Sequence, residues 1–392
     1  MATAALDIGV LQSSSRYRGI GRYTHDLARG LGAIKQPDGL RVVGFELRSW
    51  TGRAALVSDL ASAADRLADP DAPMMTHTRW AHRQRLVFAH ALRSSGVDLV
   101  HNPHPEATPI GRLGCLRVIT CHDLIPYRYP EFYAGWRDGY ATGRRWLDRR
   151  RYHGADHIIA VSHATASDLI SLTEVPASKI TVVHNGVDLS KWSPSPEPDD
   201  DAIRGRHDLA ERPYLLYVGA AEWRKNPHGM MSALKLARSR PGCGELVLAW
   251  AGKLDGPWGG RIARAADDLG LDNAVRPLGF VSDRDLAALY RGAVAKLFIS
   301  RVEGFGYPVI EAMASGCPVV ASNCSSTAEI ATDAALSVDP ENHEAIAAAI
   351  AALVTDEGER SRLREAGLLR ARRFSLERMA LATREVYREL LD

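Results

Sequence analysis

Short apolar runs of strand length alternate with helical segments along the whole chain, and no other feature restricts the fold as strongly. Chains with this alternation form parallel sheets that are covered by helices. The predicted strands of the first half are residues 4–10, 41–45, 98–101, 117–121, 157–162 and 180–184. Those of the second half are residues 214–219, 246–252, 297–300, 318–322 and 336–338. The sequence therefore predicts an α/β protein with doubly wound sheets.

The length of 392 residues predicts more than one domain, because a single hydrophobic core rarely grows to this size. Between the two sets of strands lies the stretch 193–201, which is rich in proline and aspartate and is typical of a linker or surface excursion. We expect two Rossmann-like domains, residues 1–187 and 188–375, that face each other across an interdomain cleft. A final helix over 376–391 fits either domain.

The bulk composition is that of a soluble globular protein, with 46% hydrophobic and 24% charged residues. The net charge of +2 gives no reason to expect binding to nucleic acid. The five cysteines are an odd number without CxxC spacing, so we expect neither a zinc site nor a disulfide framework and place the chain in the reducing cytoplasm. Asp7 interrupts the first apolar run, and no run of eighteen apolar residues occurs. We therefore expect no secretion signal and no membrane span.

The most informative local element runs from Glu303 to Glu311. Two carboxylates bracket a Gly-x-Gly turn between a predicted strand and a helix predicted over 309–315, with Pro308 at the helix start. The glycines allow the backbone to approach a ligand closely, and an ionised Glu311 in the first helical turn is favoured by the helix dipole. Carboxylates bind hydroxyl groups and backbone amides bind anions. The element therefore suits a polyhydroxylated ligand that carries phosphate.

Other candidate residues also follow predicted strands, where ligands of doubly wound sheets bind. Arg224 and Lys225 form an adjacent cationic pair that suits a diphosphate, because arginine supplies a planar fork and lysine a point charge. Gly19 and Gly21 form part of a GxGxxG pattern, which is weak as a dinucleotide fingerprint because Thr24 replaces the third glycine. This corner can still line an anion or sugar pocket at the N-terminus of a helix that is expected to begin near Arg22.

His122 comes at a strand end and is followed by Asp123. We expect it to donate a hydrogen bond to a sugar hydroxyl or phosphate oxygen, or to exchange a proton near neutral pH. His101, His104 and His184 lack such support and are expected to be structural. We find no HExxH motif and no paired histidine–carboxylate constellation, so the sequence predicts no metal ligand.

Two helical stretches, 79–93 and 136–151, combine arginines with tryptophan. A solvated charged face is the default interpretation of such a stretch. The alternative is attachment to a phosphate-bearing acceptor or to an anionic membrane surface, where each cation contributes about 1 kcal/mol.

Together these residues resemble a retaining GT-B glycosyltransferase of the group-one (E-x7-E) family, which includes bacterial mannosyltransferases and sucrose synthase. The matching segments are Gly19-Ile-Gly-Arg-Tyr-Thr24, His122-Asp-Leu-Ile-Pro126, Asn185-Gly-Val-Asp188, Arg224-Lys-Asn226, Leu278-Gly-Phe280, the element from Glu303 to Glu311, residues 314–322 and the helix after Phe374-Ser375. The first two segments resemble the mannosyltransferase branch particularly. The chain departs from the family at Ala220, where many relatives have arginine, and at Thr332, where glycine is usual.

The resemblance implies a role for each matched residue. Glu303 would contact donor-sugar hydroxyls beside the anomeric carbon, and Glu311 would bind the ribose. Arg224 and Lys225 would clamp the diphosphate, and His122 would meet the sugar near its C6 hydroxyl. These residues except Glu311 form the predicted catalytic set. The other predicted donor-binding residues are Gly19, Gly21, Gly219, Gly304, Phe305, Gly306, Ser325, Ser326 and Thr327.

By the same resemblance, residues 1–187 joined by the helix 376–392 form the acceptor domain, and residues 188–375 form the nucleotide-sugar donor domain. We expect a retaining hexosyltransferase that moves mannose from GDP-mannose to a lipid-linked glycan or another glycoside. It would need no metal or other cofactor, and would be cytoplasmic, with peripheral membrane contact as an option. One alternative is the same chemistry with a UDP- or dTDP-sugar. Another is a catalytically silent subunit that binds sugar nucleotides or glycans, although the intact motif argues against it.

Overall fold

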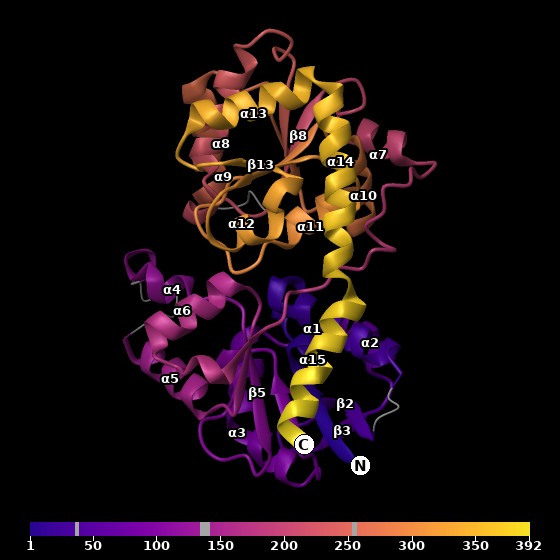
Figure 1. Ribbon diagram of the computed structural model, residues 1–392, viewed down its shortest axis with the longest axis vertical. Coiled ribbons are helices and arrows are strands. Elements are labelled where there is room, and N and C mark those ends of the chain that lie inside the picture. The colour runs from indigo at the N-terminus through magenta and orange to yellow at the C-terminus, as the bar shows by residue number, and fades with distance from the viewer. Residues whose placement is uncertain (36–38, 134–141, 253–256) are drawn as a thin grey trace. The chain divides into compact units, whose positions relative to one another are not determined.

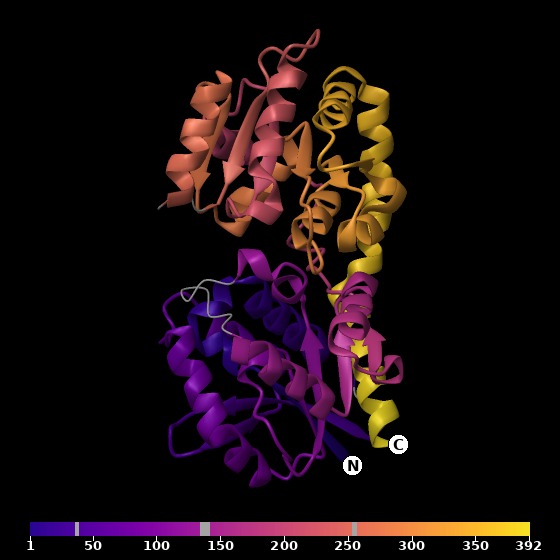
Figure 2. The same ribbon diagram turned by 90° about the vertical axis from the view of Figure 1, so that its left-hand side faces the viewer.

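The computed structural model describes residues 1–35, 39–133, 142–252 and 257–392 (Figure 1). They form two compact units. Unit 1 comprises Met1–Gly186 and Ser375–Asp392, and unit 2 comprises Val187–Phe374. Each unit contains one sheet with helices on both of its faces, as Figure 2 shows. The predicted α/β class with two doubly wound sheets is confirmed.

The sheet of unit 1 has the strand order β3-β2-β1-β4-β5-β6-β7. Its strands are β1 (Ala2–Asp7), β2 (Leu40–Leu47), β3 (Ala54–Val57), β4 (Leu99–Asn102), β5 (Leu116–Cys121), β6 (His157–Ala160) and β7 (Ile180–Val182). Neighbouring strands are parallel except β2 and β3, which pair antiparallel. Sequence analysis misses β3, because this edge strand has four residues and none of them is fully buried. It therefore lacks the apolar signal of the central strands.

The helices of unit 1 are α1 (Gly19–Ala33), α2 (Leu60–Ala68), α3 (His77–Arg93), α4 (Ile125–Arg128), α5 (Thr142–Gly154), α6 (His163–Thr173) and α15 (Leu376–Leu391). Phe88 and Leu92 of α3 share one hydrophobic cluster with residues of β1, β2 and β4. Tyr152 of α5 and Leu169 of α6 share another cluster with residues of β5 and β6.

The final helix, α15, belongs to unit 1, although its sequence left the choice open. It packs against α1, where Gly30 lies so close that an added Cβ would come within 2.7 Å of the carbonyl oxygen of Leu376. The fully buried Tyr387 of α15 also makes a 2.6 Å hydrogen bond with Nδ1 of His101, and Nε2 of this imidazole lies 2.6 Å from Thr120 Oγ1. These contacts bear out the structural role expected for His101.

The sheet of unit 2 has the strand order β10-β9-β8-β11-β12-β13, and all its neighbours are parallel. Its strands are β8 (Tyr214–Val218), β9 (Val247–Ala251), β10 (Val275–Gly279), β11 (Ala295–Phe298), β12 (Val319–Ser322) and β13 (Leu336–Val338). Sequence analysis misses β10, an edge strand that contains Pro277 and a register shift. Proline is tolerated at sheet edges because no ladder hydrogen bond is needed there, but it weakens the strand signal.

The helices of unit 2 are α7 (Asp200–Arg206), α8 (Pro227–Arg238), α9 (Pro257–Leu269), α10 (Asp283–Gly292), α11 (Tyr307–Ala314), α12 (Ser325–Ala331), α13 (His343–Thr355) and α14 (Glu357–Ala371). Residues of α8, α9 and α13 share the main hydrophobic cluster of this unit with the strands. Ser282 caps the start of α10, because its Oγ accepts a 3.2 Å hydrogen bond from the backbone N–H of Asp285.

The stretch 193–201, which was predicted to be a linker or surface excursion, enters a helix at its end. Helix α7 begins at Asp200, and this residue is only 6% exposed. Its carboxylate accepts a 2.7 Å hydrogen bond from Nε of Arg291. A buried carboxylate needs such a partner, and the partner comes from a distant part of the chain. Separately, no helix among the described residues is long and apolar enough to cross a membrane.

Candidate active site

The carboxyl edge of the unit 2 sheet brings together the residues predicted to bind the donor in the second half of the chain. Arg224 and Lys225 lie in the short 3-10 helix η7 (Trp223–Lys225) after β8, and Glu303 lies in the loop after β11. The loops are joined by the backbone N–H of Arg301, which donates a 2.7 Å hydrogen bond to the carbonyl of Arg224. The parallel strand order places these loops side by side, because β8 and β11 are neighbours in the sheet.

Glu303 is held between the two cations. Nη1 of Arg224 donates to one carboxylate oxygen, and Nζ of Lys225 donates to the other. Nε of Arg224 also donates to Glu222 at 2.7 Å. The Glu303 residue is 9% exposed, so these charge-assisted hydrogen bonds lie in a largely desolvated environment and are stronger than surface ion pairs.

The pKa of Glu303 follows from these neighbours. Burial alone would raise it, but the positive charges of Lys225 and Arg224 outweigh burial and hold the pKa of Glu303 below its usual range. The carboxylate is therefore ionised at neutral pH and acts as a hydrogen-bond acceptor.

Lys296 is a member of this charge cluster that sequence analysis missed. It lies within β11, is fully buried, and donates a 2.9 Å hydrogen bond to the carbonyl of Leu297. Its ammonium lies 4.9 Å from the ring centre of Tyr217 and 5.6 Å from that of Phe298. Burial, and then the charge of Lys225, lower the pKa of Lys296 to about 7. A lysine inside an apolar strand is the local signal that could have revealed it, because buried lysines are rare.

Two predicted serines hold the loop of Glu303 in place. Ser325 Oγ accepts from the backbone N–H of Glu303 at 3.2 Å and lies 2.7 Å from its carbonyl oxygen. Ser326 Oγ lies 2.9 Å from the carbonyl oxygens of Glu303 and Phe305. The side chains of both serines therefore position the loop, while Thr327 is 1% exposed in the next position of α12. Direct binding of phosphate by this loop stays a prediction.

Helix α11 starts two residues earlier than predicted, at Tyr307, so Pro308 occupies its second position. The residue before it, Gly306, has φ of 117°, a conformation that favours glycine. Glu311 consequently lies in the second helical turn, and its expected place in the first turn is wrong. Its side chain is buried at 1% exposure and accepts a 3.1 Å hydrogen bond from Tyr290 Oη.

Gly219 ends β8 with φ of 145°, and a Cβ at this position would lie 2.9 Å from Tyr217 Oη. Its carbonyl oxygen accepts a 3.2 Å hydrogen bond from the indole of Trp250. The next strand approaches so closely that a Cβ on Gly252 would lie 2.2 Å from the same oxygen. The close packing of these strand ends therefore requires glycine at 252, and the positive φ favours glycine at 219, whether or not a ligand contacts it.

Gly19 and Gly21 lie in unit 1 and begin α1, three residues earlier than the helix start expected near Arg22. Nothing lies within 4 Å of a Cβ added to Gly19, so this position is open. A Cβ on Gly21 would lie 2.4 Å from the carbonyl oxygen of Ser15 and from Cα of Arg16. Gly21 therefore allows α1 to pack against the preceding segment, which is a structural reason for the second glycine of the motif.

His122 also lies in unit 1, after β5. Its Nε2 donates a 2.8 Å hydrogen bond to the carbonyl of Pro103, and its ring packs edge-on against Tyr23 with a 4.8 Å centre separation. Burial lowers the pKa of His122 to about 4, and the bond to Pro103 offsets only part of this effect. The imidazole is neutral at pH 7. This lowered pKa argues against proton exchange by His122 near neutral pH, and its expected hydrogen bond to a sugar hydroxyl or phosphate oxygen stays a prediction.

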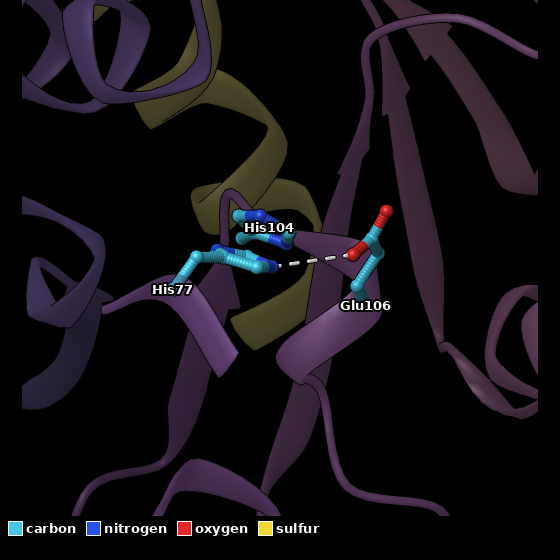
Figure 3. A group of neighbouring side chains, drawn as sticks. All are labelled: His77, His104 and Glu106. Atoms are coloured by element: carbon cyan, nitrogen blue, oxygen red, sulfur yellow. Dashed lines mark ion pairs between the residues drawn. The ribbon is translucent and has the colours of Figure 1, made fainter. Parts of the chain in front are cut away.

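The structure also corrects the expectation that no histidine–carboxylate group exists. His77, His104 and Glu106 gather in unit 1, where Nε2 of His77 lies 3.4 Å from a carboxylate oxygen of Glu106 (Figure 3). The group could not be recognised in the sequence, because His77 lies in α3 and comes 27 positions before His104. Of the basic stretch 136–151, residues 136–141 lie outside the described residues.

The predicted site residues thus fall into one group in each unit. Arg224 and Lys225 contact the side chain of Glu303, and Ser325 and Ser326 at the start of α12 contact its backbone, all within unit 2. Gly19, Gly21 and His122 belong to unit 1. A site shared between the units stays a prediction, and so does each residue's role toward a ligand.

Family comparisons cover most of the chain. The family described as "Glycosyl transferases group 1" matches residues 199–370, and the one described as "Glycosyltransferase Family 4" matches residues 17–191. O-antigen chain mannosyltransferase B of Escherichia coli is 27% identical over 391 residues, covering 95% of this chain and 96% of that protein. D-inositol 3-phosphate glycosyltransferase of Salinispora arenicola is 30% identical over 321 residues, covering 77% of this chain and 71% of that protein.

Solved structures agree on the fold. Sucrose-phosphate synthase from Thermosynechococcus elongatus superposes with a TM-score of 0.73 at 21% identity and covers 100% of this chain and 99% of that one. Anabaena HepE in complex with UDP-glucose has a TM-score of 0.74 at 17% identity and covers 99% of this chain and 100% of that one. With its two doubly wound units and its E-x7-E element, the chain belongs to the group 1 glycosyltransferases and has the GT-B fold.

Proposed function

We propose that this glycosyltransferase moves a mannosyl group from GDP-mannose to a lipid-linked glycan or another glycoside, with retention of the anomeric configuration. The observation that carries the proposed chemistry is the placement of Glu303 between Arg224 and Lys225 at the carboxyl edge of the unit 2 sheet. These groups offer one anionic acceptor for sugar hydroxyls and two cations for a diphosphate. The names of several relatives, among them two O-antigen chain mannosyltransferases, support mannose as the sugar.

In this proposal the donor exchanges partners with an existing ion pair. Without a donor, Glu303 neutralises Arg224 and Lys225. The diphosphate takes over both cations, because it offers more negative charge and several oxygens. Glu303 is then released to accept hydrogen bonds from the sugar beside the anomeric carbon. The exchange leaves no buried charge without a partner at any stage, which keeps its cost low.

Cleavage of the sugar–phosphate bond leaves its electron pair on the diphosphate and creates positive charge on the sugar. Arg224 and Lys225 would stabilise the leaving diphosphate as its charge grows, which lowers the barrier. The acceptor hydroxyl attacks the same face of the sugar, and its proton passes to the departing phosphate oxygen. No carboxylate is needed as a nucleophile in this scheme, which is why it gives retention without a glycosyl-enzyme intermediate.

A UDP-sugar donor is the second candidate, because HepE, which has the same fold, was crystallised with UDP-glucose. The deciding experiment incubates the purified chain with GDP-mannose, UDP-glucose and a dTDP-sugar in turn and measures release of the nucleoside diphosphate. We expect GDP-mannose to be turned over. Turnover of another donor, with no binding of GDP-mannose, would eliminate the mannosyl assignment.

The Glu303→Ala variant tests the site itself, and Glu344→Ala is its matched control, because Glu344 pairs with Arg240 on the surface of the same unit. We expect loss of transfer in the first variant only. Equal transfer by Glu303→Ala and the wild type would rule out the proposed site. The anomeric configuration of the product, read by NMR, tests retention.

A membrane-facing acceptor would also give the basic helix α5 a role. Trp146 is exposed, and the guanidinium of Arg150 lies 4.5 Å from its ring centre. We propose that this face binds the anionic inner surface of the membrane. In a flotation assay with anionic vesicles, the wild-type chain should rise with the vesicles and the Trp146→Ala variant should stay in the dense fraction. Equal flotation of both proteins would exclude this helix as the membrane contact.

A further inference from the structure

Three side chains with metal-binding atoms gather at one edge of the unit 1 sheet (Figure 3). His77 is the first residue of α3, His104 follows β4, and Glu106 lies in the 3-10 helix η3 (Pro105–Ala107). One ligand atom from each side chain lies within 4.8 Å of those of the other two. The three elements meet because β4 ends beside the start of α3. None of the three residues belongs to the predicted donor site of unit 2.

We propose that His77, His104 and Glu106 bind one divalent transition-metal ion, and that zinc is the ion their chemistry suits best. Two imidazoles and one carboxylate form a ligand set that proteins use for zinc, with water or another oxygen in the fourth position. The proposal is independent of the proposed function, because no ligand atom belongs to the predicted transfer machinery.

The distances fit this ion. Nε2 of His77 lies 3.4 Å from Oε2 of Glu106. Two ligand atoms that are each about 2.1 Å from a tetrahedral ion lie about 3.4 Å from one another. These two atoms therefore already have the separation that zinc requires. Since all three ligand atoms lie within 4.8 Å, His104 needs to approach by at most about 1.4 Å.

The other nitrogen of His77 is already in use. Its Nδ1 lies 3.0 Å from Ser15 Oγ. When Nδ1–H donates to this hydroxyl, the lone pair of Nε2 faces Glu106, which is the arrangement a metal-bound imidazole needs. Partners of this kind orient the ligand and raise its affinity for the ion. Ser15 thus acts as a positioning residue in this proposal.

Packing restricts the two histidine ligands. His104 is 6% exposed, and its ring stacks on that of His77 with a centre separation of 5.1 Å. Trp80 lies against both rings, at 5.1 Å from His104 and 5.4 Å from His77. Because little side-chain freedom remains to be lost, the entropic cost of binding an ion is low. The carboxylate of Glu106 also offsets the positive end of α3, which would otherwise repel a cation.

Such an ion would fasten the start of α3 to the loop after β4. Through Ser15 it would also brace the segment on which Gly21 packs, because the carbonyl of Ser15 occupies the space that a Cβ on Gly21 would need. The expected consequence is a higher melting temperature with bound zinc, since an ion that binds only the folded chain stabilises it.

The test uses the tag-free full-length chain, stripped with a chelator and titrated with Zn²⁺ in a calorimeter. We expect one equivalent to bind, and Co²⁺ in its place to give the intense visible absorption of a tetrahedral site. Glu106→Gln and His77→Gln should each weaken zinc binding at least tenfold, and Ser15→Ala by about 10- to 100-fold. His82→Gln is the matched control, because His82 lies on the exposed side of the same helix.

Glu106 is partly exposed, so its isosteric variant should fold normally, and circular dichroism will verify this. Absence of stoichiometric zinc binding to the wild type would overturn the proposal. Binding that is equally tight in Glu106→Gln and His77→Gln would overturn it too, because the ion would then lie elsewhere.

Discussion

Replacing Glu303 by glutamine should have opposite effects on nucleotide binding and on transfer. In the ligand-free chain, the carboxylate of Glu303 holds both Arg224 and Lys225, and a donor diphosphate has to displace it. Glutamine keeps the shape but not the charge. We therefore expect Glu303→Gln to bind a nucleoside diphosphate more tightly while transferring sugar more slowly.

The magnitude follows from the two hydrogen bonds. Each charge-assisted bond contributes about 1.5–3 kcal/mol, so the pair contributes about 3–6 kcal/mol that the diphosphate must replace. A neutral acceptor is about half as strong, so glutamine removes about 1.5–3 kcal/mol of this competition. Nucleoside diphosphate affinity should therefore increase by about 10- to 150-fold. Solvent weakens these hydrogen bonds little, because Glu303 is only 9% exposed.

Isothermal titration calorimetry with GDP measures the affinity, and release of GDP from GDP-mannose measures transfer. Turnover should fall by about 10²- to 10³-fold, the usual cost of losing one group that stabilises a transition state. Glu222→Gln is the comparison, because Glu222 forms an ion pair with Arg224 and its side chain is half exposed. It should tighten GDP binding much less. Unchanged or weaker GDP binding by folded Glu303→Gln would refute the exchange of partners.

Three further predictions concern the other candidate residues and the buried Lys296. Replacing Arg224 and Lys225 together by alanine removes charge-assisted hydrogen bonds that contribute about 3–6 kcal/mol. GDP binding, measured by calorimetry, should therefore weaken at least 100-fold. Unaltered GDP affinity would contradict the proposed diphosphate clamp. Lys296 has a pKa of about 7 in the folded chain and 10.5 when it is exposed. Between these pH values the unfolded chain binds more protons than the folded chain. The contribution of Lys296 to the free energy of unfolding therefore rises with pH through this window. Relative to Lys296→Met, the wild type should therefore gain up to about 5 kcal/mol between pH about 7 and about 10 in urea unfolding, whereas a difference independent of pH would show that the amine is not desolvated. His122 has a pKa of about 4 and stays neutral at higher pH. Replacing it in His122→Asn should slow transfer about fivefold, which is the cost of one neutral hydrogen bond. Because the imidazole does not titrate there, the shape of the pH–rate profile between pH about 6 and 8 should not change. A shift of that profile would mean that His122 titrates in the working range.

The central strands of both sheets were predictable because their signal is local. Each is a short apolar run bounded by turn residues, as in β8 and β12. Two of the four edge strands, β3 and β10, were missed, whereas the edge strands β7 and β13 were predicted. An edge strand is half exposed and tolerates proline, so it needs neither the apolar run nor the β-branched residues that reveal a central strand.

The candidate site was predictable as a set of residues and unpredictable as an arrangement. Strand ends on one edge of a parallel sheet must lie near each other, so the grouping of Glu303 with Arg224 follows from the pattern. Their direct pairing does not follow, because it joins residues 79 positions apart. Helix starts were predicted only to within two or three residues, and this error moved Glu311 from the first turn of α11 to the second.

The neutrality of His122 shows the same limit. Sequence analysis treats a histidine as titrating near its ordinary pKa, and only the burial of His122 beside Tyr23 reveals that its pKa is lowered. The depressed pKa of Lys296 likewise depends on the rings that surround its amine.

The sequence by itself determined the class of fold, the family, and the residue types that stand at each strand end. Hydrophobic periodicity and turn chemistry depend on near neighbours in the chain, and these are visible without coordinates. Only the tertiary structure decided which charges pair, which are desolvated, and that His77 meets Glu106. Burial and contact across distant segments set pKa values and ion pairs, and those quantities exist only once the sheets have assembled.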